Sequence, residues 1–207
     1  MRLIAACLLF ASSFAMAQGA VAPTVDYTVV SIIGDRYTVL DKDVSTVAMG
    51  TAALDGAVLA TVKEVLAERL PGSNVSLAVM REPAVFQAEA EVLALTRNTQ
   101  PLLDALQPVL SRIQARRVVL VSKTRKATER GELEGAGFIA AAGANTAVFV
   151  EFRVTMIDQA TGRVLDEERI SVSEPVRDAN EDKVAILRSV ATLQVRRVMP
   201  GLIERSR

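Results

Sequence analysis

The sequence predicts an α/β or α+β fold, in which a single mixed-sheet sandwich carries helices packed on the sheet. Apolar residues alternate at strand spacing in several short runs, most clearly over 147–157. They recur at helical spacing over 51–70, 99–113 and 181–203. Strands and helices therefore alternate along the chain, which is typical of layered domains. With 207 residues, half of them apolar, the chain has material for one ordinary domain.

Residues 1–17 predict a secretory signal peptide. Arg2 supplies a positive charge, an apolar core follows, and small residues precede a cleavage site after Ala17. A lipoprotein signal ending in Cys7 is the rival interpretation, but only six residues precede that cysteine, too few for a charged region and an apolar core. We therefore expect one periplasmic domain over 18–207. Association with the outer membrane is left open.

The domain is expected to begin with an N-terminal β-hairpin. Residues 25–40 hold two apolar runs joined at Gly34, which suits a type II′ turn. A polar connector is expected over 41–50. The stripe of Leu and Val over 51–70 indicates an amphipathic helix that a Pro-Gly pair ends. A short strand follows over 75–80.

Two prolines help to define the helices predicted in the middle of the chain. Pro83 suits the first turn of a helix. Thr99 is the expected cap of the next helix, and Pro108 is expected to kink or restart it. Residues 117–122 form a compact apolar run that predicts a buried strand.

A late β-hairpin followed by a C-terminal helix is expected to complete the domain. The strand over 147–157 leads into a turn over 158–162, where Gly162 is available for a positive φ. The returning strand, 163–172, is rich in charge, as edge strands often are. The last helix is expected over 181–203.

Composition excludes several classes of chemistry. The chain has no His and no Trp, and Cys7 is its single cysteine. Zinc and haem sites that depend on His, and catalytic triads that depend on imidazole, are therefore excluded. The 24 basic and 24 acidic residues balance, which argues against nucleic-acid binding through a cationic surface. We expect no catalytic residue, metal or cofactor; a hydrolase built on carboxylates, such as Asp41 with Asp43, is the remaining enzymatic alternative.

A basic cluster follows the strand over 117–122. Loops at the carboxyl ends of strands commonly hold ligands in open α/β sheets, and clustered cations suit an acidic protein surface or a small anion. The simpler interpretation is a solvated loop whose charges are shared with nearby glutamates. The candidate binding residues of this cluster are Lys123, Arg125, Lys126 and Arg130.

Two glutamates complete the candidate binding site. Glu132 and Glu134 alternate with glycines over 131–137, an arrangement that would place them on a tight turn facing a site. The simpler interpretation is that the glycines allow close backbone packing. No apolar run after the signal reaches membrane-spanning length. The sequence leaves open the oligomeric state and whether residues 136–157 contact a membrane.

Residues 148–165 contain Arg153 and, further on, the run Asp158-Gln159-Ala160-Thr161-Gly162-Arg163-Val164-Leu165. This segment resembles the R-L-V-D-x-x-T-G-x-V-L hairpin of a periplasmic α/β domain. That domain is shared by the curli-secretion lipoprotein, the outer-membrane activators of penicillin-binding proteins and the N-terminal domain of the Tol-system propeller protein. The resemblance implies a scaffolding or envelope-assembly role and supplies no catalytic residue.

We therefore expect an exported, non-enzymatic envelope protein that serves as a protein-interaction or assembly module, with an envelope protein as its partner. The alternative is a periplasmic protein that binds a small anion or a cell-wall fragment through the same basic loop.

Overall fold

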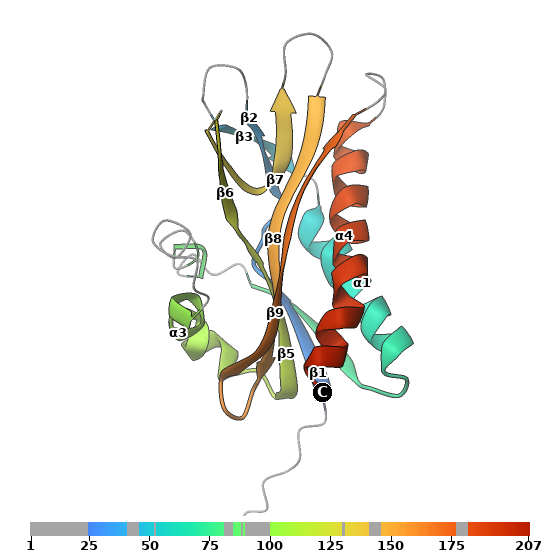
Figure 1. Cartoon of the computed structure of the whole chain (residues 1–207). Coiled ribbons are helices and arrows are strands. Elements are labelled where there is room, and N and C mark those ends of the chain that lie inside the picture. Colours follow the sequence, from blue (N-terminus) through green and yellow to red (C-terminus); the bar gives the residue numbers. More distant parts are fainter. Residues whose placement is uncertain are drawn as a thin grey trace, which may run out of the picture.

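The structure is a computed structural model in which nine strands form one mixed sheet with helices on both faces (Figure 1). The fold class predicted from the sequence is confirmed. The structure describes residues 25–40, 46–51, 53–80, 85–87, 89, 100–129, 131–140, 146–176 and 182–207.

The strands follow the order β3-β2-β7-β8-β5-β1-β4, with β6 on β7 and β9 on β8. Residues 85–87 and 89 are also helical. The bounds in chain order are β1 (Val25–Ser31), β2 (Arg36–Leu40), β3 (Thr46–Thr51), α1 (Leu54–Arg69), β4 (Val75–Val79), α3 (Gln100–Leu110), β5 (Ala115–Lys123), β6 (Arg125–Thr128), β7 (Gly131–Ala140), β8 (Thr146–Asp158), β9 (Arg163–Pro175) and α4 (Lys183–Arg205).

Strand β8 joins two halves of the sheet. On one side it pairs with β9 along its whole length. On the other side, residues 146–151 of β8 pair with β7 and residues 152–158 pair with β5. One half-sheet therefore holds β5, β1 and β4, and the other holds β7, β2 and β3. Both halves share β8 and β9.

The core lies in two layers, one on each face of the sheet. Alternate residues of β1 divide between them: Val29 packs with α1 and α4, whereas Val30 packs with α3. Both valines are fully buried. The near-continuous apolar run of β1 therefore fits a strand covered on both faces.

The predicted N-terminal hairpin over 25–40 is wrong, and the first hairpin of the chain is formed by β2 and β3. Strand β1 pairs with β4 and β5, and the antiparallel partner of β2 is β3. Part of the expected connector over 41–50 is therefore strand. Gly34 does have a positive φ of 68°. It lies where the chain passes from one half-sheet to the other, so a turn-compatible glycine did not fold the chain back on itself.

Most of the remaining expected elements are confirmed, whereas Pro83 and Thr99, the expected helix starts, lie outside the described residues. Helices α1 and α4, strands β4 and β5, and the β8–β9 hairpin occupy the predicted segments. The carboxylate of Asp182 caps α4 by accepting from two backbone N–H groups. Pro108 lies inside α3, which ends two residues later. Strand β9 is an edge strand that pairs with β8 alone among the described strands.

The predicted signal peptide over 1–17, with its cleavage site after Ala17, lies outside the described residues and stays a prediction. Within the described ranges, no helix combines the length and the apolar character needed to cross a bilayer.

Gly137 lies in close contact with the backbone of β2. It pairs with Thr38 on one side and Phe149 on the other. A Cβ atom at residue 137 would lie 2.0 Å from the Thr38 carbonyl oxygen and 2.9 Å from the Phe149 ring. Only glycine fits here, because the obstructing oxygen belongs to the backbone of the neighbouring strand.

We expect Gly137→Ala to lower the free energy of unfolding by about 3 kcal/mol, since overpacking of this kind forces the backbone to shift. Urea denaturation measures the effect. Gly56→Ala is the matched control, because Gly56 lies in α1 with no atom within 4 Å of a new Cβ. Alanine there should raise the free energy of unfolding by about 1 kcal/mol. Equal midpoints for wild type and Gly137→Ala would contradict the β2–β7 register.

Candidate functional site

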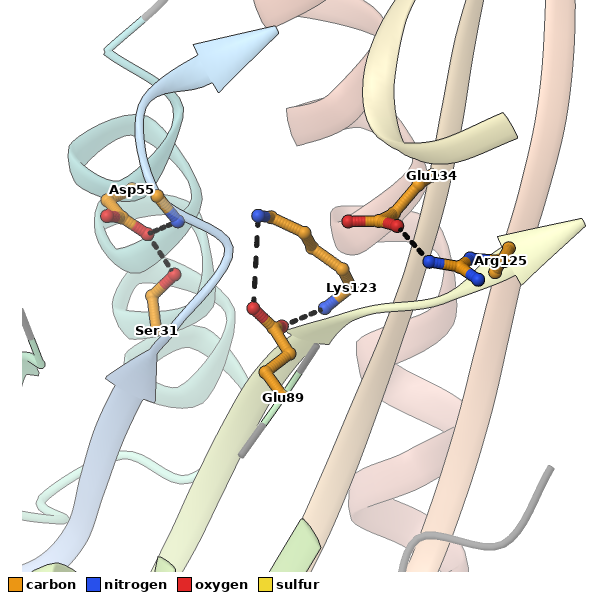
Figure 2. A network of polar contacts seen from close by, with 7 residues as sticks. Ser31, Asp55, Glu89, Lys123, Arg125 and Glu134 are labelled. Atoms are coloured by element: carbon orange, nitrogen blue, oxygen red, sulfur yellow. Dashed lines mark hydrogen bonds and ion pairs between the residues drawn. The ribbon is translucent and has the colours of Figure 1, made fainter. Parts of the chain in front are cut away.

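A cluster of charged and polar side chains lies where the two half-sheets separate (Figure 2). Here β1 ends at Ser31 and β5 ends at Lys123, and from Gly135 onward β7 takes the place of β5 beside β8. The two strands that end here are parallel. The carboxyl ends of parallel strands, at a change in connection, are the usual place for a ligand in open α/β sheets.

Glu89 takes the place of a missing strand partner at this point. The N–H of Ile32 donates to the carbonyl oxygen of Val121 at 3.0 Å, so the next donor in a parallel ladder is the N–H of Lys123. That group donates to Glu89 Oε1 at 2.8 Å. The Lys123 ammonium lies 3.8 Å from the other oxygen, Oε2. The carboxylate therefore binds both the backbone and the side chain of Lys123.

The environment of Glu89 favours its protonated form. Burial raises the pKa of Glu89 to about 7, because a carboxylate loses its hydration there, and the negative charges of Glu134 and Asp55 act in the same direction. The charge and the backbone N–H of Lys123 act in the opposite direction and only partly offset burial. Glu89 can therefore hold or release a proton near neutral pH.

The stem of Lys123 lies directly over a glycine. A Cβ atom at Gly135 would come within 3.1 Å of the Lys123 Cδ atom, and Gly135 has a φ of +67°. The glycine thus leaves room for the lysine to reach Glu89. This is the close packing that the simpler interpretation of the 131–137 glycines anticipated.

Asp55 ties the start of α1 to the crossover between β1 and β2. Its buried carboxylate accepts from the Ser31 hydroxyl and, at 3.2 Å, from the Gly34 N–H. Its own N–H donates to Asp35 Oδ1 at 3.1 Å. The residue at the N-cap position, Ala53, has no side chain that could do this. Contacts from the crossover therefore supply part of the capping that α1 lacks locally.

The expected loop after Lys123 is instead the β6–β7 hairpin, and Glu132 and Glu134, expected on a tight turn, lie in strand β7. Arg125 lies directly opposite Glu134 in the ladder. It donates to Glu134 Oε2 at 2.7 Å and lies 3.1 Å from Glu132 Oε2. Two glutamates therefore share the charge of this arginine. Figure 2 shows the Arg125–Glu134 pair on one side of Lys123 and the Ser31–Asp55 pair on the other.

Strand alternation separates the predicted basic residues. Lys126 pairs with Leu133, on the face opposite Arg125, and is exposed. Among the described residues, no carboxylate forms an ion pair with Lys126. Arg130 lies outside the described residues. Lys123, Arg125 and Lys126 therefore do not form one cationic surface, and their role in binding stays a prediction.

Three residues of the cluster were missed from the sequence: Ser31, Asp55 and Glu89. For Glu89 there was a usable signal, because it follows Phe86 by three residues and so falls on the apolar side of the expected helix. An acid on that side must find a partner when it is buried. Asp55 carried no such signal, since an acid in the first turn of a helix is ordinary.

The arrangement limits what the cluster can do chemically. Ser31 is fully buried, and Asp55 and Glu89 are only 2% exposed, so their polar atoms contact protein groups rather than solvent. In the described part of the chain, no set of three or more acidic or thiol side chains could hold a metal ion. The cluster can exchange a proton at Glu89, and it fixes the crossover of β1.

A scan against protein-family models finds no match for the chain, and neither does a search of the curated proteins. Among solved structures, the chain is similar to protein XCC0632 from Xanthomonas campestris, whose family model is DUF330. The identity is 12% and the TM-score 0.48, over 89% of this chain and 88% of that one. It is also similar to the PelC L103M dodecamer from Paraburkholderia phytofirmans, with 13% identity and a TM-score of 0.43 over 87% and 90% of the two chains.

A further solved structure with a similar fold is lipoprotein GNA1162 from Neisseria meningitidis. The identity is 16% and the TM-score 0.38, over 82% of this chain and 97% of that one. The chain therefore has a distant structural similarity to these proteins, and the finer family resemblance noted in the sequence stays a prediction. At these scores it carries no argument about function.

The raised pKa of Glu89 predicts a specific dependence of stability on pH. The folded protein holds this proton more tightly than the unfolded chain, so the extra stability is fully present below pH 4.5 and is lost as the pH rises to about 7. The loss is on the order of 3 kcal/mol. We expect Glu89→Gln to remove this slope, because the amide does not titrate.

Urea denaturation at a series of pH values tests the prediction. Glu132→Gln, which changes an exposed carboxylate of the same region, should retain the wild-type slope. Parallel stability curves for wild type and Glu89→Gln between pH 4.5 and 7 would refute the assignment.

Proposed function

We propose that this chain is an exported, non-enzymatic module of the cell envelope that works by binding or assembling with another protein. The observation that carries the proposal is the open edge of β9. This strand has 13 residues and, among the described strands, pairs with β8 alone. In Figure 1 it crosses in front of β8, and α4 runs alongside it.

An open edge of this length offers a row of backbone donors and acceptors to an added strand. Exposed positions of β9 alternate with less exposed ones, and the pairing with β8 shifts by one residue at Leu165. The exposed positions include Leu165, a large apolar side chain that is 39% exposed, together with the charges of Glu167 and Arg169. A partner strand would thus find hydrogen bonds, one apolar contact and charges of both signs.

The polar groups that could react with a substrate are buried and bonded to other groups of the protein. This supports a role in binding rather than catalysis. The Ser31 hydroxyl is fully buried against Asp55, and the Glu89 carboxylate is buried beneath Lys123. The chain has no His to act as a general base near pH 7. Export is supported by the signal-like pattern over 1–17 and by the lack of any cysteine beyond residue 7.

The alternative function, binding of a small anion or a cell-wall fragment through the basic residues, has less support. Glu89 offsets the charge of Lys123, while Glu132 and Glu134 offset that of Arg125. Lys126 is the exposed cation of β6 that could still meet an anion. A thermal-shift series with phosphate and muropeptides separates the two functions, since a ligand far above its dissociation constant raises the melting temperature.

We expect Leu165→Lys to reduce capture of an envelope partner at least fivefold, because it replaces the apolar contact of the β9 edge with a charge. Purified variants serve as bait in envelope extract, and captured protein is quantified. Leu77→Lys on β4 and Leu193→Lys on α4 are matched controls, since these leucines are 44% and 58% exposed but lie elsewhere.

Lys126→Glu tests the predicted basic surface in the same assay. Loss of capture with Lys126→Glu alone would move the binding surface to the β6–β7 hairpin. Equal capture by all four variants and wild type would reject the β9 edge.

A further inference from the structure

We propose that a pocket beside the first turn of α4 binds the apolar tail of an anionic acyl compound, with Lys183 next to its anionic group. The pocket, called the α4 pocket below, has a volume of about 240 Å³. Its lining includes no residue of β9, so this site is separate from the β9 edge. The apolar lining comes from Tyr37 and Val39 of β2, Phe138 and Ala140 of β7, and Val184 of α4.

The pocket is open because small side chains end the sheet on this face. Ala140 is the last residue of β7 and pairs with Thr146, the first residue of β8. Residues directly across an antiparallel ladder point to the same face, and both of these line the pocket. Two residues further into the sheet, the corresponding pair is Phe138 and Val148, and both are buried in the main core. The larger pair fills the space beneath the helix, and the smaller pair leaves it empty of side chains.

The placement of the helices also leaves this part of the sheet uncovered. Helix α1 packs against β1 and β4, which belong to the other half-sheet. Helix α4 begins at Lys183, beside the ends of β7 and β8 (Figure 1). Val184 packs at the edge of the main core. Among the described helices, only the first turn of α4 forms a wall of the pocket.

Two aromatic rings form the apolar wall on the sheet side. The rings of Tyr37 and Phe138 meet edge to face, with centroids 5.3 Å apart and planes at 85°. Phe138 is buried in the main core, and Tyr37 is half-buried beside it. Pockets that bind small molecules are mostly apolar and aromatic, with a few polar groups that orient the ligand. The α4 pocket has this composition.

The polar groups of the pocket are available to a ligand. The hydroxyls of Tyr37 and Thr146 and the ammonium of Lys183 make no hydrogen bond or ion pair with any described residue. Lys183 is exposed and is the one charged side chain among the described residues of the lining. The carboxylate of the neighbouring Asp182 caps α4 by accepting from two backbone N–H groups. A cation beside an apolar pocket favours a ligand with an anionic group at one end.

Volume and charge together define the ligand. An apolar cavity of about 150 Å³ holds benzene, so the α4 pocket has room for about ten non-hydrogen atoms. Octanoate has an apolar tail and a carboxylate that together match this size. Its tail would lie against Tyr37 and Phe138, and its carboxylate would accept from the Lys183 ammonium. A free fatty acid and an anionic membrane lipid both present this chemistry.

Titration calorimetry with octanoate tests the charge, using the chain as the cell processes it. We expect Lys183→Gln to raise the dissociation constant for octanoate at least fivefold, because the carboxylate loses its cation. The constant for octanol, which has the same tail without the charge, should not change. Lys126→Gln removes an exposed cation on β6 and is the matched control. Equal octanoate constants for wild type and Lys183→Gln would overturn the proposal.

Filling the pocket tests its location. We expect Ala140→Leu to raise the dissociation constants for octanoate and octanol at least tenfold, because leucine occupies the space of the tail. Thr146→Leu fills the same space from β8 and should have the same effect, so the test does not depend on one variant. Ala127→Leu, the same change at an exposed residue of β6, is the matched control. Thermal melts identify the variants that fold.

Flotation with phosphatidylglycerol vesicles identifies the source of the tail. Flotation of wild type that is lost in Ala140→Leu would assign the tail to a membrane lipid. Octanoate binding without flotation would assign it to a free fatty acid. The proposal is overturned if wild type neither binds octanoate saturably nor floats, or if binding is unchanged in the folded filling variants.

Discussion

The fold depends on the fact that two strands cannot occupy the same side of β8 at the same level. Strand β5 pairs with the second part of β8 and β7 with the first, so β5 must leave before β7 enters. This replacement separates β1 from β2 as well, because each follows its own neighbour. Backbone groups at the gap lose their ladder partners, and a buried donor without an acceptor would cost stability.

The buried polar cluster supplies hydrogen-bond partners for these backbone groups. Glu89 supplies the acceptor that the Lys123 N–H lacks. Asp55 accepts hydrogen bonds from Ser31 and Gly34 at the crossover that follows β1. Burying a carboxylate is costly, and the ammonium of Lys123 together with protonation of Glu89 reduces the cost. The cluster thus has a structural reason to exist at the place where ligands often bind.

Periodicity in the sequence predicted the elements better than their partners. The stripes of α1 and α4 and the alternation of β8 are local patterns, so they could be read from neighbouring residues. Pairing between distant strands leaves no such local trace. Gly34 illustrates this, because a positive φ suits a tight hairpin and a crossover between half-sheets equally. The sharing of the Arg125 charge with glutamates was anticipated, whereas the strand pairing that produces it was not. The contact between Glu89 and Lys123 spans 34 residues, beyond the reach of any local pattern.

The position of β8 and α4 near the end of the chain has a consequence for how the protein is made. The strand that both half-sheets require begins at Thr146, and α4 supplies Leu187, Val195, Met199 and other fully buried residues to the main core. A ribosome that has made the first two-thirds of the protein has not yet made the strand that joins the two half-sheets. The complete sheet and its main core can therefore form only when synthesis is nearly finished.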